Sequence, residues 1–472
     1  MAVSLRITAV VVCMLLMPSL GSASLPAPIA QVLEWQQLST DEVSLLVQPV
    51  DGGEPLLAHA ADRSRNPASI SKLFTTFAAL EALGPAYRWK TEVYTRQAPR
   101  DGVLDGDLWI KGYGDPFLVN EEFWKLVGEI RRLGIHEIRG DLVFDNSHYA
   151  LAPEDPGAFD NQPHRAYNQP PHPLLVNFNA LQFFIEPDAE RDAVRVQPEP
   201  PLPGLSVENR LRPASGACGG FQRGVSYAVP REGQVVLEGH YARTCDRFRL
   251  LRVAVPPPDY AHGLFQLYWE QLGGRFSGGW REDVWRDDQA EPLLVHKSRP
   301  LGDLLRVVNK YSNNVMTRHL KLALGVEAFG EPATQGKGER ALFDVLEQQG
   351  LDTDGLILDN AAGLSRTNRA TANQVAALLQ QAHRSPFAPE YLASFPLAGL
   401  DGTVRRRFQD AEETGRMRLK TGRLDDVSAI AGYVRTASGR DLIVVVLVNG
   451  PEAHRGRGEA VQDAVLRWAY RQ

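Results

Sequence analysis

The sequence has little excess charge, few cysteines and only one long apolar run. Its formal net charge is −6 over 472 residues, which provides neither a basic face for nucleic acid nor a long acidic tail. It contains no internal repeat and no low-complexity tract, which excludes repeat architectures. With 43% hydrophobic and 23% charged residues, the chain has an ordinary globular composition and enough length for about two or three cores.

The first 23 residues are predicted to be a cleaved signal peptide. Arg6 precedes an apolar run over residues 7–20, and small residues follow at 21–23, as in Sec-type signals. The run is too short to span a bilayer comfortably, and Cys13 lacks the small neighbours of a lipidated cysteine. We therefore expect export to the periplasm. Peripheral association with the membrane and a homodimer are both compatible with the sequence.

Removal of this segment leaves two cysteines, Cys218 and Cys245. In an exported protein the simplest interpretation is a disulfide, which would stabilise the fold by roughly 3 kcal/mol. Two free thiols are the alternative. Both cysteines lie far along the chain from the motifs described below, so we expect a structural role.

The hydrophobic pattern changes twice along the chain. A helical pattern over residues 73–80 gives way, from about residue 90 to 293, to short alternating runs, proline clusters and one clear helix. After Pro300 the pattern is helical again and ends in two apolar strands. The predicted helices after this point are 301–324, 340–349, 371–383 and 459–470, and the predicted strands are 427–434 and 442–448.

Both ends of the chain therefore look like parts of one α/β (α+β) domain. We assign residues 24–90 and 294–472 to this domain and residues 91–293 to a β-rich insertion. Because chain termini usually lie close together on a domain surface, such an insertion is physically easy.

Three short motifs occur in a fixed order. Ser69 and Lys72 form the only S-x-x-K of the chain, Ser312 and Asn314 fit S-x-N, and residues 420–422 form the only K-T-G. Each motif is weak by itself, and S-x-N also occurs at residues 64–66. The order of the three, together with their context, raises their significance.

The context of Ser69 favours an activated hydroxyl. Ser69 opens the apolar helix, where backbone N–H groups favour developing negative charge. Lys72 lies one turn further on, so its amine reaches the Ser69 hydroxyl. A lysine acts as a base when burial and a second cation lower its pKa, and Lys420 is a candidate for that cation. The structural alternative is a capping serine beside a solvated lysine.

The other two motifs suit the opposite wall of a cleft. Ser312 lies in a helical stretch, and Asn314 can face the same cleft across a turn. Residues 420–422 precede the strand predicted at 427–434, where a substrate backbone can add to a sheet edge and Gly422 leaves room for it. The alternative for the S-x-N motif is a polar surface turn. The alternative for the K-T-G motif is an exposed edge lysine that prevents aggregation.

In this order, the motifs resemble the signature of penicillin-binding proteins and serine β-lactamases. The flanking text is similar to that of the class C low-molecular-mass penicillin-binding proteins, the D-alanyl-D-alanine carboxypeptidase/endopeptidases. The similar segments are residues 67–73, 114–118, 138–145, 309–314, 363–366, 397–403 and 420–422. The resemblance covers nearly the whole mature chain and implies a transpeptidase/β-lactamase-like domain with an insertion of two small domains.

This resemblance implies a role for each catalytic residue. Ser69 would attack the penultimate D-Ala carbonyl of a peptidoglycan peptide, with Lys72 as general base. Ser312 would pass a proton to the leaving amine, and Asn314 would bind the substrate amide. β-Lactam antibiotics would acylate the same serine.

The resemblance also implies a set of binding groups. Lys420 and Thr421 would hold the terminal carboxylate. The backbone N–H groups of Ser69 and Arg423 would form the oxyanion hole, whose loss typically costs about 3 kcal/mol.

Further positions match the family's substrate groove. They are Arg366, Asp425 and, from the insertion, Asp160. Three residues depart from the family pattern: Arg423 replaces Ser or Thr, Asp425 replaces a neutral polar residue, and Tyr311 precedes the S-x-N serine.

No cofactor or metal is predicted. His148, His164 and His172 cluster in the proline-rich segment, but they lack the ligand spacing typical of zinc sites. Two other functions are compatible with the motifs: a β-lactamase or esterase of the same fold, and a non-catalytic wall-binding protein. The long insertion argues against the first, and the intact motifs argue against the second.

Overall fold

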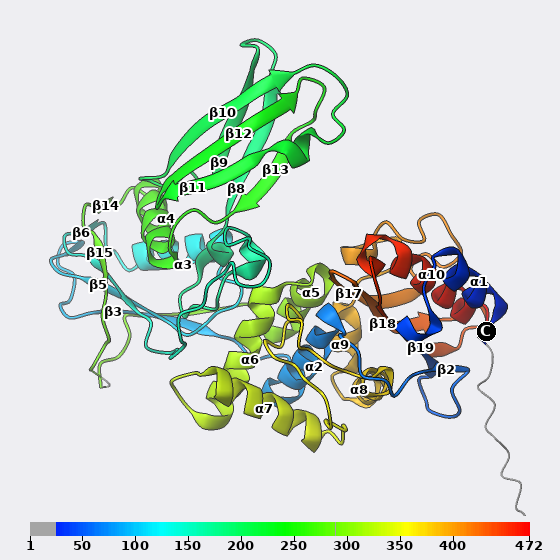
Figure 1. The fold of residues 1–472 in the computed structure, drawn as a ribbon. Coiled ribbons are helices and arrows are strands. Elements are labelled where there is room, and N and C mark those ends of the chain that lie inside the picture. The colour runs from blue at the N-terminus through cyan, green and yellow to red at the C-terminus, as the bar shows by residue number, and fades with distance from the viewer. Residues whose placement is uncertain (1–24, 288) are drawn as a thin grey trace, which may run out of the picture.

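The computed structural model describes residues 25–287 and 289–472. The predicted signal peptide and Cys13 lie outside the described residues. In the part of the chain that is described, no helix combines the length and the apolar composition needed to cross a membrane. This part folds into a mixed α/β structure (Figure 1), as predicted.

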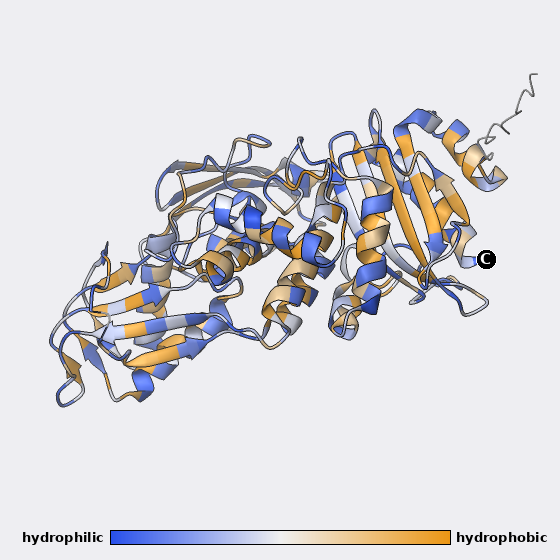
Figure 2. Ribbon diagram, turned by 90° about the horizontal axis from the view of Figure 1, so that it is seen from below, coloured by the Kyte–Doolittle hydropathy of each residue, from blue (hydrophilic) through white to orange (hydrophobic). Residues whose placement is uncertain are grey.

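Strands from both ends of the chain form one five-stranded antiparallel sheet, in the order β17-β18-β19-β1-β2. Successive residues point to opposite faces, so Ile443 and Val445 pack in one core cluster, and Val444 and Val446 in another. The central strands are apolar on both faces (Figure 2). The strands are β1 Val43–Pro49, β2 Leu57–His59, β17 Met417–Leu424, β18 Val427–Arg435 and β19 Asp441–Asn449.

Helices cover both faces of this sheet. Two of them, α1 Ala27–Trp35 and α10 Arg457–Tyr470, share a core cluster with one face. At the centre of the other layer lies α2, in which Leu73, Phe74 and Phe77 are buried because neighbouring helices surround it. The helices of this layer are α2 Ser71–Leu83, α5 Leu301–Tyr311, α6 Asn314–Phe329, α7 Gln335–Gln348, α8 Ala372–Arg384 and α9 Ala388–Ser394.

The middle of the chain builds separate sheets. One group has a five-stranded sheet, β15-β7-β5-β3-β16, and a three-stranded parallel sheet, β14-β6-β4. Two helices, α3 Asn120–Arg132 and α4 Pro257–Gln271, pack with them. The strands are β3 Lys90–Thr95, β4 Val103–Leu104, β5 Leu108–Gly112, β6 Glu137–Ile138, β7 Leu142–Asp145, β14 Arg275–Phe276, β15 Trp280–Glu282 and β16 Leu294–Lys297.

A second group of strands is nested between β7 and α4 along the chain. It forms two three-stranded sheets, β13-β8-β9 and β10-β12-β11, which Figure 1 shows as a separate layer in green. Its strands are β8 Leu181–Asp188, β9 Ala193–Glu199, β10 Ser206–Ala214, β11 Ser226–Arg231, β12 Gln234–Ala242 and β13 Phe248–Arg252.

Short 3-10 helices connect these elements. They are η1 Thr40–Glu42, η2 Ala68–Ile70, η3 Ala166–Asn168, η4 Val176–Asn179, η5 Phe221–Gly224, η6 Gly402–Val404 and η7 Ala453–Arg455.

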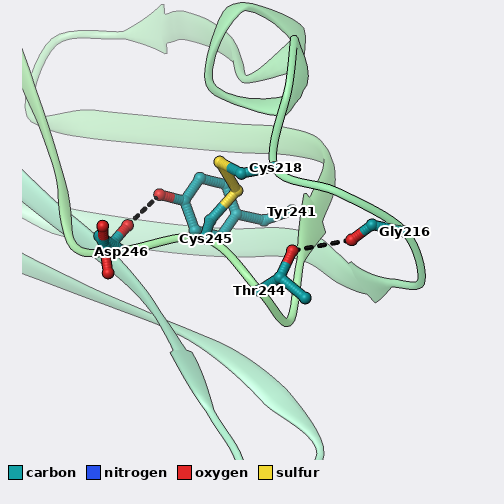
Figure 3. Close-up of a disulfide and its surroundings, with 6 residues drawn as sticks. All are labelled: Gly216, Cys218, Tyr241, Thr244, Cys245 and Asp246. Carbon is teal, nitrogen blue, oxygen red and sulfur yellow. Dashed lines mark hydrogen bonds between the residues drawn. A yellow bond between two sulfur atoms is a disulfide. The ribbon is translucent and has the colours of Figure 1, made fainter.

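The predicted cysteine pair is bonded in the nested group. Figure 3 shows Cys218 joined to Cys245 beside the ring of Tyr241. The Tyr241 hydroxyl donates a hydrogen bond of 2.6 Å to the Asp246 carbonyl, and the Thr244 hydroxyl donates one of 2.7 Å to the Gly216 carbonyl. The disulfide therefore ties the end of β12 to the loop that leads into η5.

Four features differ from the sequence predictions. The single helix predicted over 301–324 is two helices, because Ser312 has a left-handed φ of 56°. The K-T-G motif lies inside its own strand, β17, and not before the first strand of the pair. A second helix, α4, starts in the run of prolines, since proline suits the first turn of a helix. Finally, β16 pairs with β3, so residues 294–297 belong to the sheet of the middle region.

Candidate active site

Ser69 lies in η2, immediately before α2. The preceding residue, Ala68, has a φ of 47°, a left-handed conformation that is uncommon and costly for a residue with a side chain. The side-chain oxygen of Asn66 accepts a hydrogen bond of 2.8 Å from the Ala68 N–H, and the buried side chains of α2 hold the other end of the turn. This strained turn fixes the Ser69 hydroxyl at the start of a helix.

The Lys72 amine is buried beside Ser69. It lies 3.0 Å from Ser69 Oγ, donates a hydrogen bond of 2.6 Å to Asn314 Oδ1 and donates another to the Ala362 carbonyl. The Lys72 side chain has no exposure to solvent. Burial, together with the nearby Lys420 ammonium, holds the pKa of Lys72 well below its ordinary value.

Ser312 and Asn314 lie at the junction between α5 and α6. Ser312 ends α5 in the left-handed conformation, which re-aims the chain. Asn313 then caps α6 by accepting a hydrogen bond of 3.0 Å from the Met316 N–H. This cap places Asn314 at the first position of α6, where its side chain also donates a bond of 3.3 Å to the Tyr167 carbonyl. The junction therefore carries both polar side chains of the S-x-N motif.

Lys420 faces this junction from the edge strand β17. Its Nζ donates hydrogen bonds of 2.9 Å to Ser312 Oγ and 2.7 Å to the Thr421 carbonyl. Burial lowers the pKa of Lys420 to about 7. Next to it, the Thr421 hydroxyl donates to the Thr403 hydroxyl over 2.8 Å. The structure thus brings the three motifs together around Ser69.

Two glycines allow the backbone to pack closely around the Ser69 turn. A Cβ at Gly422 would lie 3.0 Å from the Ser69 nitrogen and 2.6 Å from the Pro67 carbonyl oxygen. A Cβ at Gly363, which has a φ of +84°, would lie 2.2 Å from the Ala68 carbonyl oxygen and 2.7 Å from Ser69 Cα. Contacts this short are not tolerated, so both positions require glycine for the serine turn to keep its place.

The remaining predicted positions lie around this centre. Arg423 is exposed in β17, directly after Gly422. Arg366 is exposed, approaches Asp425 to 3.3 Å and lies over the ring of Phe159. These groups form a charged rim on the β17 side.

Asp160 reaches the centre through a neighbour. It accepts hydrogen bonds of 2.8 Å from the Tyr167 hydroxyl and from the Asn168 side-chain amide. Since the Tyr167 carbonyl accepts from Asn314, Asp160 is linked to the centre by one intervening residue.

Sequence reasoning missed three contributors to this site. Thr403 lies in the family-like segment 397–403, which was a usable signal. The Tyr167 and Ala362 groups are backbone carbonyls, and no side-chain pattern identifies such acceptors. Only the folded arrangement reveals them.

The three histidines have different surroundings, and His164 lines a cavity that Ser312 and Asn314 also line. His148 lies 3.1 Å from a Glu331 carboxylate oxygen, His164 packs against Tyr227, and burial lowers the pKa of His172. Across residues 25–287 and 289–472, no group of three or more His, Cys, Asp or Glu side chains is arranged to hold a metal ion.

Comparisons with known proteins agree with the geometry. The model of the D-Ala-D-Ala carboxypeptidase 3 (S13) family matches residues 25–472. A D-alanyl-D-alanine carboxypeptidase of Actinomadura sp. (strain R39) is 32% identical over 434 residues, covering 88% of this chain and 77% of that protein. The D-alanyl-D-alanine carboxypeptidase DacB of Haemophilus influenzae is 28% identical over 388 residues, covering 81% of this chain and 80% of that protein.

Solved structures share the fold. Penicillin binding protein 4 (dacB) from Haemophilus influenzae superposes with a TM-score of 0.78 at 24% identity, covering 94% of this chain and 99% of that chain. This likeness confirms the predicted fold class. The family match extends over all but the first 24 residues, and it confirms the predicted serine hydrolase. The chain belongs to the D-Ala-D-Ala carboxypeptidase 3 (S13) family of serine peptidases.

Proposed function

We propose that this protein cleaves the D-Ala-D-Ala bond of peptidoglycan stem peptides, and the corresponding bond of cross-links, through an acyl-enzyme on Ser69. One observation carries the proposal: the buried Lys72 amine lies 3.0 Å from Ser69 Oγ and is also bonded to Asn314. An amine of lowered pKa at hydrogen-bond distance from a hydroxyl is the arrangement that general-base activation requires.

The contacts of Lys72 orient the neutral amine. The Asn314 side-chain oxygen and the Ala362 carbonyl are acceptors only, so they take its two N–H groups. Its lone pair is then left for the Ser69 hydroxyl. In the acylation step this amine takes the hydroxyl proton while Ser69 Oγ bonds to the penultimate D-Ala carbonyl carbon.

The carbonyl oxygen of the substrate becomes negative in this step. Because Gly422 has no side chain, the backbone of β17 approaches the Ser69 nitrogen closely. We propose that the Ser69 and Arg423 N–H groups stabilise the oxyanion there.

The leaving amine needs a proton as its C–N bond breaks. Ser312 is the donor that we propose, and it is re-protonated from Lys420, whose Nζ lies 2.9 Å away. Lys420 and Thr421 also hold the substrate carboxylate, which favours the charged form of Lys420. The proton that Lys72 took from Ser69 then returns to Lys420, which leaves Lys72 neutral. Water hydrolyses the ester on Ser69 with Lys72 as base once more, and the proton taken from the water passes to Ser69 Oγ.

The proposed substrate groove continues along the charged rim. Arg366, Asp425 and Asp160 are proposed to bind the peptide side chain. A β-lactam acylates Ser69 by the same chemistry. A solved penicillin binding protein 4 (dacB) from Haemophilus influenzae is complexed with a β-lactam, which supports this step.

A labelled penicillin tests the proposal. Mass spectrometry of the purified protein is expected to show one adduct, on the peptide that contains Ser69, and none in Ser69→Ala. The matched control is Ser64→Ala, an exposed serine of the second S-x-N segment, which is expected to label fully. An adduct on another residue, or a full adduct in Ser69→Ala, would contradict the assignment.

Product analysis then identifies the activity. The protein is expected to release D-Ala from an uncross-linked pentapeptide and to split a cross-linked muropeptide dimer. Rapid turnover of penicillin without either product would instead identify a β-lactamase.

We also propose that the mature protein acts in the periplasm. The disulfide between Cys218 and Cys245 suits an oxidising compartment, and the N-terminal pattern suits export. The homodimer and the peripheral membrane association stay predictions, which sedimentation and vesicle flotation of the mature protein would test.

A further inference from the structure

A cavity of about 990 Å³ opens next to the S-x-N junction. Its walls come from three parts of the chain: the loop before η3, η5 with β13 of the nested strands, and the junction between α5 and α6. Ser312 and Asn314 line it, so the cavity is continuous with the catalytic centre. Its volume is in the range of known ligand sites.

The cavity is strongly basic, and we name it the arginine cavity. No carboxylate lines it. Its basic lining residues are Arg165, Arg223, Arg249, Arg252 and His164. This composition does not follow from the chain as a whole, whose formal net charge is −6. A concave surface of one sign attracts ligands of the opposite sign.

Two of these arginines contact neutral oxygen atoms. Arg165 Nε lies 3.4 Å from the Gln162 side-chain oxygen, and Arg252 donates a hydrogen bond of 2.8 Å to the Leu251 carbonyl. The contrast is Arg247, just before β13, which pairs with Glu186 at 2.7 Å. Arg252 is half-buried, and burial together with the Arg165 guanidinium lowers the pKa of Arg252. Like charges held together at such a cost are typical of binding sites.

Large apolar side chains lie in the same cavity. Tyr311 is 69% exposed, Leu251 46% and Tyr167 42%, and all three line the cavity. Exposed aromatic and aliphatic groups gathered in one hollow mark a surface that a ligand covers. An organic anion with apolar groups, such as a peptide, fits this lining better than a small inorganic ion does.

We propose that the arginine cavity binds carboxylates of a cross-linked substrate. These carboxylates belong to the part of the peptide that extends beyond the residues held at Ser69. This inference rests on the proposed function. Charge complementarity favours a ligand with two or more carboxylates. Because Ser312 and Asn314 line both the cavity and the catalytic centre, one substrate molecule can occupy both. The cavity is lined by residues other than Arg366 and Asp425, so it adds a second charged contact.

The test compares substrates that differ in carboxylates. The first is a blocked short peptide ending in D-Ala-D-Ala, whose only charge is the terminal carboxylate. The second is a cross-linked peptide dimer with several carboxylates, and the third is the same dimer with its side-chain carboxylates amidated. The variant is Arg249→Gln combined with Arg252→Gln, and the matched control is Arg247→Gln, which removes an arginine outside the cavity.

The double variant is expected to lower kcat/KM for the dimer by about tenfold or more, the effect of one or two charge-assisted hydrogen bonds. Its kcat/KM for the short peptide and the amidated dimer should stay within about twofold of wild type. The wild-type rate on the dimer should also fall more steeply with salt than the variant's rate. Arg247→Gln is expected to change none of these rates.

Several results would overturn the inference. One is an equal loss on the charged and the amidated dimer, and another is no loss on either. Competition by a phosphate polymer, without competition by a free multi-carboxylate peptide, would assign the cavity to a different ligand. If the double variant fails to label with penicillin, the exposed single variant Arg249→Gln replaces it, with a smaller loss expected on the dimer alone. Failure of the wild type on the short peptide would instead refute the proposed function.

Discussion

Lys420→Met is expected to stabilise the folded protein at pH 7 while it disables the enzyme. The side chain is buried, and its pKa is about 7 in the fold, against about 10.4 in an unfolded chain. With this pKa the lysine is about half neutral at pH 7, and the lowering of its pKa costs the fold roughly 4 kcal/mol at that pH. Methionine has a similar length and removes that cost, but it also removes the hydrogen bonds to Ser312 and Thr421, each worth about 1 kcal/mol. The expected net gain is about 2 kcal/mol.

The pH dependence tests the cause of this gain. Because the folded pKa lies below the unfolded one, the unfolded chain binds the extra proton between pH 7 and about pH 10. Wild-type stability therefore rises through this window owing to Lys420, and the variant lacks this rise. Denaturant unfolding is expected to show the advantage of Lys420→Met shrinking by roughly 3 kcal/mol from pH 7 to pH 9.5.

The control for this experiment is Lys297→Met, an exposed lysine in β16. Its stability relative to wild type should be the same at both pH values. The reasoning is refuted if Lys420→Met destabilises the protein by the same amount at pH 7 and at pH 9.5.

Three further changes test other parts of the site. Gly422→Ala puts a Cβ 3.0 Å from the Ser69 nitrogen, and it should slow penicillin acylation about 100-fold or more in stopped-flow assays; an unchanged rate would disprove the oxyanion assignment. Thr403→Val removes the partner of the Thr421 hydroxyl and should raise KM for short peptides about threefold to tenfold without changing kcat; a loss confined to kcat would contradict the positioning role. Cys218→Ser with Cys245→Ser should cost roughly 3 kcal/mol of unfolding free energy, and denaturant melts showing no loss would exclude a stabilising disulfide.

The spacing of apolar residues correctly predicted those helices and strands in which apolar residues recur at regular intervals. β18 and β19 are continuous apolar strands, and α3 has a clear apolar stripe. β17 was missed because Arg418, Lys420 and Arg423 interrupt its apolar residues, although Lys420 is buried and only Arg423 is exposed. The position of β17 is set by pairing with β18 and by the contacts around Ser69. The strand propensities of single residues carry no information about these contacts.

The break at Ser312 was hidden for a similar reason. Helical spacing continues across residues 301–324, and serine is compatible with a helix, so only the left-handed backbone at Ser312 reveals two helices. The motif side chains could be predicted because their types and order are specific. The Ala362 and Tyr167 carbonyls could not be predicted, since every residue carries the same group.

The protonation state of Lys72 tests the account most directly. In protein labelled with ¹³C at the lysine ε-carbons, one signal absent from Lys72→Met should titrate far below the ordinary lysine pKa, in line with the burial of the amine and its neighbour Lys420. The account predicts an amine that is already uncharged at the pH where Ser69 is acylated. A Lys72 signal that stays in its charged position up to pH 9, while acylation proceeds at full rate below that pH, would contradict it.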